Sequence, residues 1–158
     1  ETLSKKKLDN LIETQNMRGD ANVMYAQIEK LDEINDKRCA IYQYYYEHLK
    51  PLQDKGLIDL PVIPEGCRAN AHMFYLKVKD LDTRTKLLSY MKEKGVLCVF
   101  HYIPLHSAPA GLKYGVFSGE DEYTTRESDR LLRLPMFYNL DMKDVEYITR
   151  CLLDYDQY

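Results

Sequence analysis

The stretch Asn70–Tyr102 reads NAHMFYLKVKDLDTRTKLLSYMKEKGVLCVFHY and contains the pattern that decides the fold class. Residues 70–79 are rich in aromatic and β-branched side chains, which predicts a strand. Residues 96–102 are nearly all apolar, which predicts a second strand that is largely buried. Two strands separated by a charged segment long enough for a helix indicate an α/β domain.

The charged segment itself predicts that helix. Asp82 is a favourable N-cap residue, because its carboxylate can accept hydrogen bonds from the first free N–H groups of a helix over residues 83–94. Gly95 follows at the position where helices commonly end.

Two helices are predicted before the first strand. Residues 3–15 predict a short helix with an apolar side. A long amphipathic helix begins at Ala21 and should end near Pro51, because proline disfavours helical geometry in the residue before it. Residues that would share one face of the long helix recur every three or four positions along the sequence. They are Met24, Ile28, Leu31, Ile34, Arg38, Ile41 and Tyr45.

The last third of the chain predicts shorter elements. Residues 103–109 should be irregular, because a proline lies near each end of this segment. Thr124 and Glu127 have the spacing of a capping box for a helix through Leu132. Residues 134–137 predict an edge strand, where the N–H that proline lacks is not needed.

A final helix should be capped by Asp141, with an apolar stripe made of Val145, Ile148, Leu152 and Tyr155. The elements together predict a small α/β (α+β) domain. It should contain a three- to four-stranded sheet with helices packed on one face, and a long N-terminal helix.

The composition excludes several classes of partner. The net charge is −3 and no basic stripe follows the chain, so we expect no nucleic acid. The longest apolar run, about residues 96–100, is too short to span a membrane, so we expect no membrane partner. The first residues do not resemble a signal peptide. Cysteines lie at positions 39, 67, 98 and 151 without a C-x-x-C pair, which is typical of a reduced, cytoplasmic protein.

The strongest candidate for chemistry is Phe100–His106, FHYIPLH, where the second predicted strand opens into a proline-stiffened loop. His101 and His106 can titrate near neutral pH and can donate or accept hydrogen bonds. The alternative is that both only bond the loop backbone. A metal site would recruit Cys98 with the two histidines, but no fourth ligand is near and none is predicted.

The first predicted strand also carries a histidine. Strand alternation places His72 with Phe74 and Leu76 on one face, and Met73 with Tyr75 on the other. We expect His72 to be an interface residue rather than a catalyst. The chain contains no G-x-G-x-x-G, Walker, G-x-S-x-G or H-E-x-x-H motif.

Four strings in order resemble the DegT/DnrJ/StrS family of sugar aminotransferases. They are AQIEKLDEIN at residues 26–35, NAHMFY at 70–75, FHYIPLH at 100–106 and YTTRESDRLLRLP at 123–135. The resemblance extends from Ala21 to about Tyr155. It implies that residues 21–158 are the C-terminal small domain of a fold type I, PLP-dependent transferase, and it leaves residues 1–20 unassigned.

The resemblance also implies an activity for the parent enzyme. Glutamate would donate its amino group, through PLP, to C4 of a dTDP-4-keto-6-deoxyhexose. Such an enzyme serves deoxysugar biosynthesis, as for lipopolysaccharide or enterobacterial common antigen, and acts as a homodimer with active sites shared between subunits. Sugar nucleotide and glutamate are the implied substrates.

Site residues follow from the same resemblance. His101, Tyr102 and His106 are implied to bind and position the substrate. No residue is assigned as catalytic, because no segment resembles the strand that carries the cofactor lysine, and Lys5–Lys7 lie in a charged, solvated stretch. We therefore expect this chain to bind no PLP and to be inactive alone, its partner being a PLP-binding domain.

A stand-alone module that binds a sugar nucleotide or a protein is the alternative. In a part of an enzyme, the apolar stripe at Met24, Ile28 and Leu31 would be incompletely covered and would favour self-association. In an independent module, that stripe would be covered by residues 1–20, through Leu8, Leu11 and Ile12.

Overall fold

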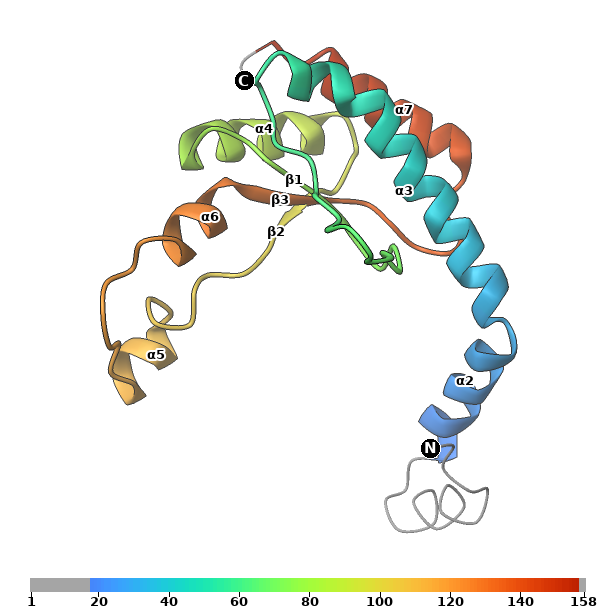
Figure 1. Ribbon diagram of the computed structural model, residues 1–158, viewed down its shortest axis with the longest axis horizontal. Helices are drawn as coiled ribbons and strands as arrows, with labels where there is room; N and C mark the ends of the chain where they lie inside the picture. Colours follow the sequence, from blue (N-terminus) through green and yellow to red (C-terminus); the bar gives the residue numbers. More distant parts are fainter. Residues whose placement is uncertain (1–17, 157–158) are drawn as a thin grey trace. The chain divides into compact units, whose positions relative to one another are not determined.

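The computed structural model describes the backbone of residues 18–156 and the side chains of residues 23–156. The helices are α2 (Arg18–Glu29), α3 (Leu31–Asp54), α4 (Leu81–Glu93), α5 (Pro109–Tyr114), α6 (Thr124–Arg130) and α7 (Met142–Leu153). The strands are β1 (Phe74–Lys77), β2 (Val99–Phe100) and β3 (Leu131–Leu134) (Figure 1). The chain divides after Asp36 into two compact units, and the sheet belongs to the second.

The sheet is antiparallel, with β3 between β1 and β2. Phe74 lies opposite Leu134 across one edge of β3, and Val99 lies opposite Arg133 across the other. Three strands agree with the predicted number. The prediction of an edge strand over residues 134–137 is wrong, because the strand ends at Leu134 and is central. Pro135 follows directly, at a position where the sheet no longer requires a backbone N–H.

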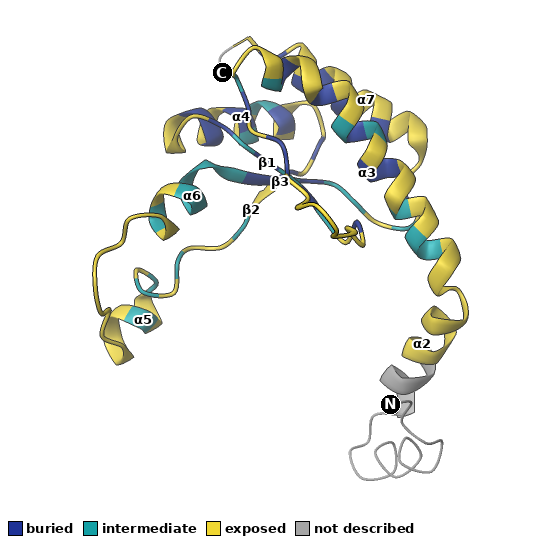
Figure 2. Cartoon of the chain, viewed as in Figure 1, coloured by how far each residue is buried: buried dark blue, intermediate teal, exposed yellow. Residues whose placement is uncertain are grey.

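One face of the sheet holds the core, as predicted. Helices α3, α4 and α7 all lie on this side (Figure 1). Dark blue in Figure 2 marks the buried residues of these helices and of the strands that they cover. Alternation along the strands sends every second side chain into the core. The largest fully buried side chains are Tyr45, Phe74, Ile41, Leu49, Leu76, Leu87, Met91, Leu132, Leu152, Val78 and Val145.

The opposite face of the sheet is only partly covered, and we call it the open face. Tyr75 and Lys77 of β1, and Leu131 and Arg133 of β3, are half-buried there. Val99, opposite Arg133, is 39% exposed. In Figure 1, no helix of the described part of the chain lies flat along this side of the strands.

The prediction that residues 96–102 form a largely buried strand is wrong. The strand is limited to Val99–Phe100, and both residues are exposed. Val96 and Cys98 are buried, whereas Leu97 between them is 73% exposed. The segment is an edge with one side toward the core, so its apolar composition did not reveal which residues the helices cover.

The long N-terminal helix is broken once and extends further than predicted. Lys30 forms the break, with its N–H bonded to the Gln27 carbonyl at 3.2 Å. The predicted end near Pro51 is wrong, since α3 continues to Asp54. Burial of Leu52 in the core stabilises the additional turn, although proline removes one helical hydrogen bond.

Helix capping was predicted correctly for α7 and wrongly for α4. The Asp141 carboxylate accepts the Lys143 N–H at 3.1 Å at the start of α7. Asp80, not Asp82, caps α4, where it accepts both the N–H and the hydroxyl of Thr83 at 2.9 and 2.8 Å. These bonds lower the pKa of Asp80. Asp82 lies inside the first turn.

The stripe of α2 and the start of α3 is exposed, with Met24 61%, Ile28 58% and Leu31 50% accessible. Leu8, Leu11 and Ile12, the predicted cover, lie outside the described residues, as does the helix predicted over residues 3–15. The division at residue 20 therefore stays a prediction. Across residues 18–156, none of the helices combines the length and apolar character needed to cross a membrane.

Phe74 anchors the sheet to α3 and gives a test of the fold. Its ring is fully buried, 5.0 Å from the Tyr42 ring and 5.2 Å from the Tyr45 ring. Phe74→Ala should lower the free energy of unfolding by about 3–5 kcal/mol, because it leaves a cavity among aromatic rings. Phe137→Ala, at a ring that is 50% exposed, is the matched control and should cost much less. Urea unfolding measures both, and equal losses would contradict this packing.

Candidate functional site

The candidate site begins where β2 ends. Tyr102 has φ of 59°, in the left-handed region that is uncommon for a bulky residue. The Ser128 hydroxyl of α6 donates to the Tyr102 carbonyl at 2.8 Å, and the Arg133 guanidinium lies 5.7 Å from the centre of the Tyr102 ring. Contacts from two other elements thus hold a strained backbone conformation, as is common at functional sites.

His101 and Tyr102 lie side by side just after β2, and their predicted role in substrate binding stays a prediction. Their rings are 5.1 Å apart and line one pocket of about 370 Å³. The Nδ1 atom of His101 is buried and has no hydrogen-bond partner within the described residues. The remaining lining residues are Ile103, Pro104, Thr124, Glu127, Ser128 and Leu131.

His106 lies apart from that pocket. Its Nε2 atom is 2.9 Å from the Asp121 carboxylate and 3.3 Å from the Thr125 hydroxyl, and its ring is 4.5 Å from that of Phe117. The Thr125 hydroxyl also donates to Asp121. These contacts, first that of Thr125, lower the pKa of Asp121. His106 therefore connects the loop before α5 to the segment that leads into α6.

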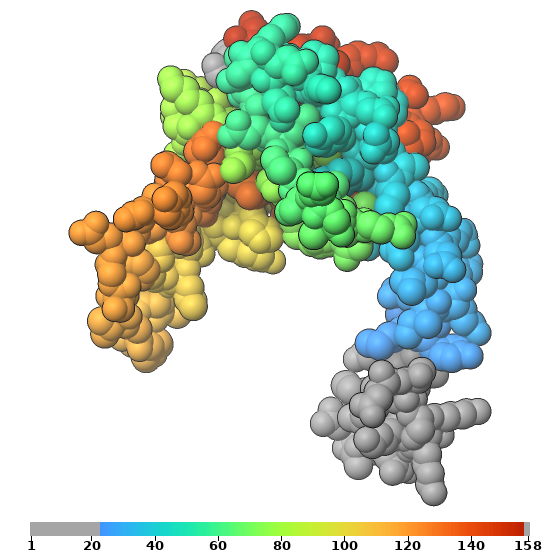
Figure 3. All heavy atoms as spheres, viewed as in Figure 1, coloured from blue at the N-terminus to red at the C-terminus, as the bar shows by residue number. Residues whose placement is uncertain are grey.

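A second pocket, of about 620 Å³, surrounds α5 and includes His106. Helix α5 and the loops beside it project as a lobe, yellow to orange in Figure 3. Gly111 allows α5 to approach the preceding loop, because a Cβ there would collide with the Leu105 carbonyl oxygen. The lobe exposes Leu112, Tyr114 and Val116.

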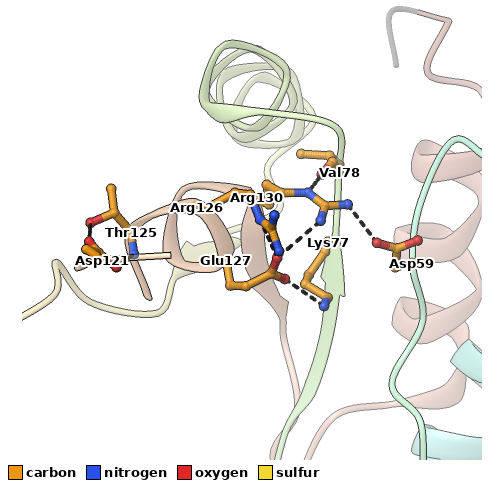
Figure 4. Close-up of polar contacts among 8 residues, drawn as sticks. All are labelled: Asp59, Lys77, Val78, Asp121, Thr125, Arg126, Glu127 and Arg130. Carbon is orange, nitrogen blue, oxygen red and sulfur yellow. Dashed lines mark hydrogen bonds and ion pairs between the residues drawn. The ribbon is translucent and has the colours of Figure 1, made fainter. Parts of the chain in front are cut away.

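An ion network fixes α6 beside β1 (Figure 4). The Glu127 carboxylate is 2.8 Å from Lys77 Nζ and 3.4 Å from Arg130 Nη1. Arg130 also binds Asp59 at 2.7 Å and donates to the Val78 carbonyl at 2.8 Å. The hydrogen bond from Lys77 is the largest cause of the lowered pKa of Glu127. The network fixes α6, which lines the pocket of His101 and Tyr102, beside β1.

The predicted capping box is therefore wrong. Tyr123, not Thr124, is the N-cap of α6, and its side chain makes no capping bond. Glu127 instead reaches across to β1, since the pairing with Lys77 uses its carboxylate. The i,i+3 spacing of Glu127 and Arg130 was a signal for part of this network, but Lys77 lies fifty residues away.

Arg84 of α4 supports the site from the core side. It is buried, its guanidinium donates to the Ser128 carbonyl and lies 5.1 Å from the centre of the Phe100 ring. Burial lowers the pKa of Arg84. The Arg84 side chain thus joins β2, which ends two residues before Tyr102, to α6, which carries Ser128.

The structure shows where His72 lies and what surrounds Cys98, the third residue of the metal hypothesis. His72 is exposed and its Nδ1 is 2.7 Å from the Asn70 side-chain oxygen, so its predicted position beside Phe74 is wrong. The chain turns before the strand, where Ala71 has φ of 49°.

Burial raises the pKa of the Cys98 thiol to about 12, which disfavours the thiolate that a metal requires. Residues 18–156 hold no cluster suited to a metal ion.

PLP forms an imine with a lysine side chain in the enzymes that use it. A lysine that forms an imine must lose its proton, which a desolvated setting favours. Every described lysine is exposed except Lys77, and the Lys77 ammonium is bound to Glu127. Lys5–Lys7 lie outside the described residues. Binding of PLP by this chain stays untested by these observations.

The ion network generates a stability prediction. Glu127→Gln should lower the free energy of unfolding at neutral pH by roughly 1 kcal/mol or less, because the network is partly solvated. The pKa of Glu127 is lowered in the folded chain, so this contribution should be present above its ordinary pKa of 4.5 and be lost as the pH falls through the folded value. Urea unfolding from neutral to acidic pH measures it.

Glu146→Gln, at an exposed position on α7, is the matched control. It should change stability little at any pH. A loss for Glu127→Gln that is the same at acidic and neutral pH would contradict a role for the ionised carboxylate.

Comparison with known proteins identifies the family. The sequence matches the model of the DegT/DnrJ/EryC1/StrS aminotransferase family over residues 14–153. The dTDP-3-amino-3,4,6-trideoxy-α-D-glucose transaminase of Micromonospora megalomicea subsp. nigra is 28% identical over 128 residues, which are 78% of this chain and 33% of that protein. The dTDP-3-amino-3,6-dideoxy-α-D-galactopyranose transaminase of Aneurinibacillus thermoaerophilus is 32% identical over 111 residues, 68% of this chain and 29% of that protein. The chain spans about a third of the length of these curated relatives.

Solved structures share the fold. The aminotransferase TlmJ from Streptoalloteichus hindustanus superimposes with a TM-score of 0.73 at 22% identity, over 84% of this chain and 34% of that one. The predicted fold class is confirmed by this likeness. The predicted family is confirmed by the match over most of the sequence: the chain belongs to the DegT/DnrJ/EryC1/StrS family of PLP-dependent sugar aminotransferases.

Proposed function

We propose that residues 21–158 form the C-terminal small domain of a transaminase that transfers an amino group from glutamate to C4 of a dTDP-4-keto-6-deoxyhexose. Family membership supports the reaction class, and two relatives are named as dTDP-sugar transaminases. Those names specify 3-amino sugars, so the experiment below compares amination at C3 with amination at C4.

The pocket shared by His101 and Tyr102 carries the proposal. A sugar presents hydroxyl and carbonyl groups, and it requires donors and acceptors at fixed positions. His101 offers a buried Nδ1 without a partner in the described structure, and Tyr102 is 69% exposed. Ser128 and Arg133 hold Tyr102 in its strained conformation, so that its orientation is set before a substrate binds.

His106 has a different geometry, which supports a positioning role in our proposal. Its ring bonds Asp121 and Thr125 and does not line the pocket of His101. Through these contacts it would hold the lobe around α5 in place relative to α6. Direct contact between His106 and substrate stays a prediction from the family resemblance.

The described lysines are exposed or, for Lys77, ion-paired, which supports a cofactor site on another part of the protein. We propose that PLP, which supplies the amino-group transfer chemistry in this family, is bound by a separate domain that packs against this one. In the proposed enzyme, two copies of the whole form a dimer. Residues of this chain would bind and orient the sugar rather than attack it.

A chimera tests the proposal. The matched segment of the Aneurinibacillus thermoaerophilus relative is replaced by residues 21–158, and transamination with glutamate is measured on dTDP-linked 4-keto and 3-keto sugars. We expect turnover of the 4-keto sugar. His101→Ala and Tyr102→Phe should each lower kcat/KM about 10-fold or more, since a sugar-binding hydrogen bond is lost. His48→Ala, at an exposed position of α3, is the control.

Turnover of the 3-keto sugar alone would contradict the assignment to C4. A folded chimera that binds PLP but aminates neither sugar would contradict the proposed domain function. Tight binding of a dTDP-sugar by the unmodified chain, together with that inactive chimera, would favour the stand-alone binding module.

A further inference from the structure

We propose that Arg84 of α4 is a positioning residue: from the core side of the sheet, it sets the conformation in which Tyr102 meets the substrate. The proposal deepens the proposed function and rests on it. Arg84 does not line the pocket of His101 and Tyr102, so it would act through its neighbours rather than by contact with a substrate.

The place of Arg84 is fixed by the capped start of α4. Its N–H donates to the Asp80 carbonyl at 3.0 Å, and the Asp80 carboxylate accepts both the N–H and the hydroxyl of Thr83. Thr83 and Arg84 are both buried. A side chain on such a rigid element can hold its partners at a defined place, as a supporting residue of a site must do.

Two contacts of the Arg84 guanidinium flank Tyr102. Its Nη1 atom donates to the Ser128 carbonyl, and the Ser128 hydroxyl in turn donates to the Tyr102 carbonyl at 2.8 Å. The same guanidinium lies over the ring of Phe100, two residues before Tyr102, at 5.1 Å from the ring centre. Arg84 is thus connected to Tyr102 through α6 and also through the end of β2.

The chemistry of these two contacts suits arginine in particular. Ser128 lies in the last turn of α6, where backbone carbonyls have no partner within the helix and a cation interacts favourably with the helix dipole. A planar guanidinium can donate from its edge while it also packs on an aromatic ring. The ammonium of a lysine would replace one contact but not both.

The burial of Arg84 is costly, which supports a role beyond folding. Burial lowers the pKa of Arg84, although the charge of Asp129 acts in the opposite direction. None of the ion pairs among the described residues includes Arg84, and its Nε atom is buried without a hydrogen-bond partner among residues 23–156. A well-packed apolar side chain often stabilises a core as much as a buried charge does. The cation at this place is therefore explained by what it holds.

Nuclear magnetic resonance of the full chain is the first test. At positive φ a residue's N–H lies close to its own Hα, so Tyr102 should give a strong nuclear Overhauser signal between these two protons. We expect Arg84→Met to weaken this signal about twofold or more, because a strained conformation persists only where its surroundings hold it. Arg84→Lys should be intermediate. Arg150→Met, at an exposed position of α7, is the matched control and should keep the full signal.

Kinetics of the chimera described above are the second test. Arg84→Met should lower kcat/KM about 10-fold, mostly through kcat, since a bound sugar would be held less well for reaction. In a chimera that already carries Tyr102→Phe, the same change should cost clearly less, because Arg84 acts through Tyr102 and the two effects should not add. Arg84→Lys should recover part of the loss.

A Tyr102 signal that is the same in Arg84→Met and in the unchanged chain would overturn the proposal. Full multiplication of the two kinetic losses in the double variant would also overturn it, because that result indicates a merely structural role. If circular dichroism shows that Arg84→Met does not fold, Arg84→Lys decides, and an unchanged Tyr102 signal overturns the proposal. An active chimera whose kcat/KM ignores Arg84 refutes only this inference, whereas an inactive chimera with an Arg84-dependent Tyr102 signal refutes only the proposed function.

Discussion

The structure depends on the register of β3, the central strand. Because side chains alternate, Leu132 and Leu134 enter the core while Leu131 and Arg133 reach the open face. A slip of one residue would exchange the two sets, exposing leucine and burying an arginine, so the register is strongly determined. The same strand follows directly after α6. Its position therefore also sets where the site-forming side chains of that helix lie.

The site is held together by long-range polar contacts around this strand. Glu127 and Arg130 connect α6 to β1, and Ser128 connects the same helix to the backbone of Tyr102. Arg84 reaches the Ser128 carbonyl from the core side. The strained backbone of Tyr102 is thus held directly by α6, and α6 is itself fixed by β1 and α4, which explains how a loop can present side chains in a defined orientation.

Local signals predicted local features well. Asp141 caps its helix, Phe74 and Leu76 enter the core, and the polar loop after β2 does form a pocket. Features that depend on distant partners were not predictable in this way. Glu127 fits a capping pattern, but the ammonium of Lys77 competes for its carboxylate. The apolar residues of β2 gave no sign that this strand lies at the edge of the sheet. The face of the sheet on which Arg133 lies could not be predicted either, because it depends on how β3 pairs with both neighbouring strands.

In the proposed function, the loop after β2 binds the sugar nucleotide beside β3. The most direct measurement is a nuclear magnetic resonance titration of the chain with a dTDP-linked 4-keto-6-deoxyhexose, following the backbone amides. The account predicts that shifts concentrate in residues 73–77, 99–104 and 131–133, while the exposed side of α7 stays unchanged. Shifts confined to α7 or α3, or no shifts at concentrations that saturate the parent enzyme class, would contradict it.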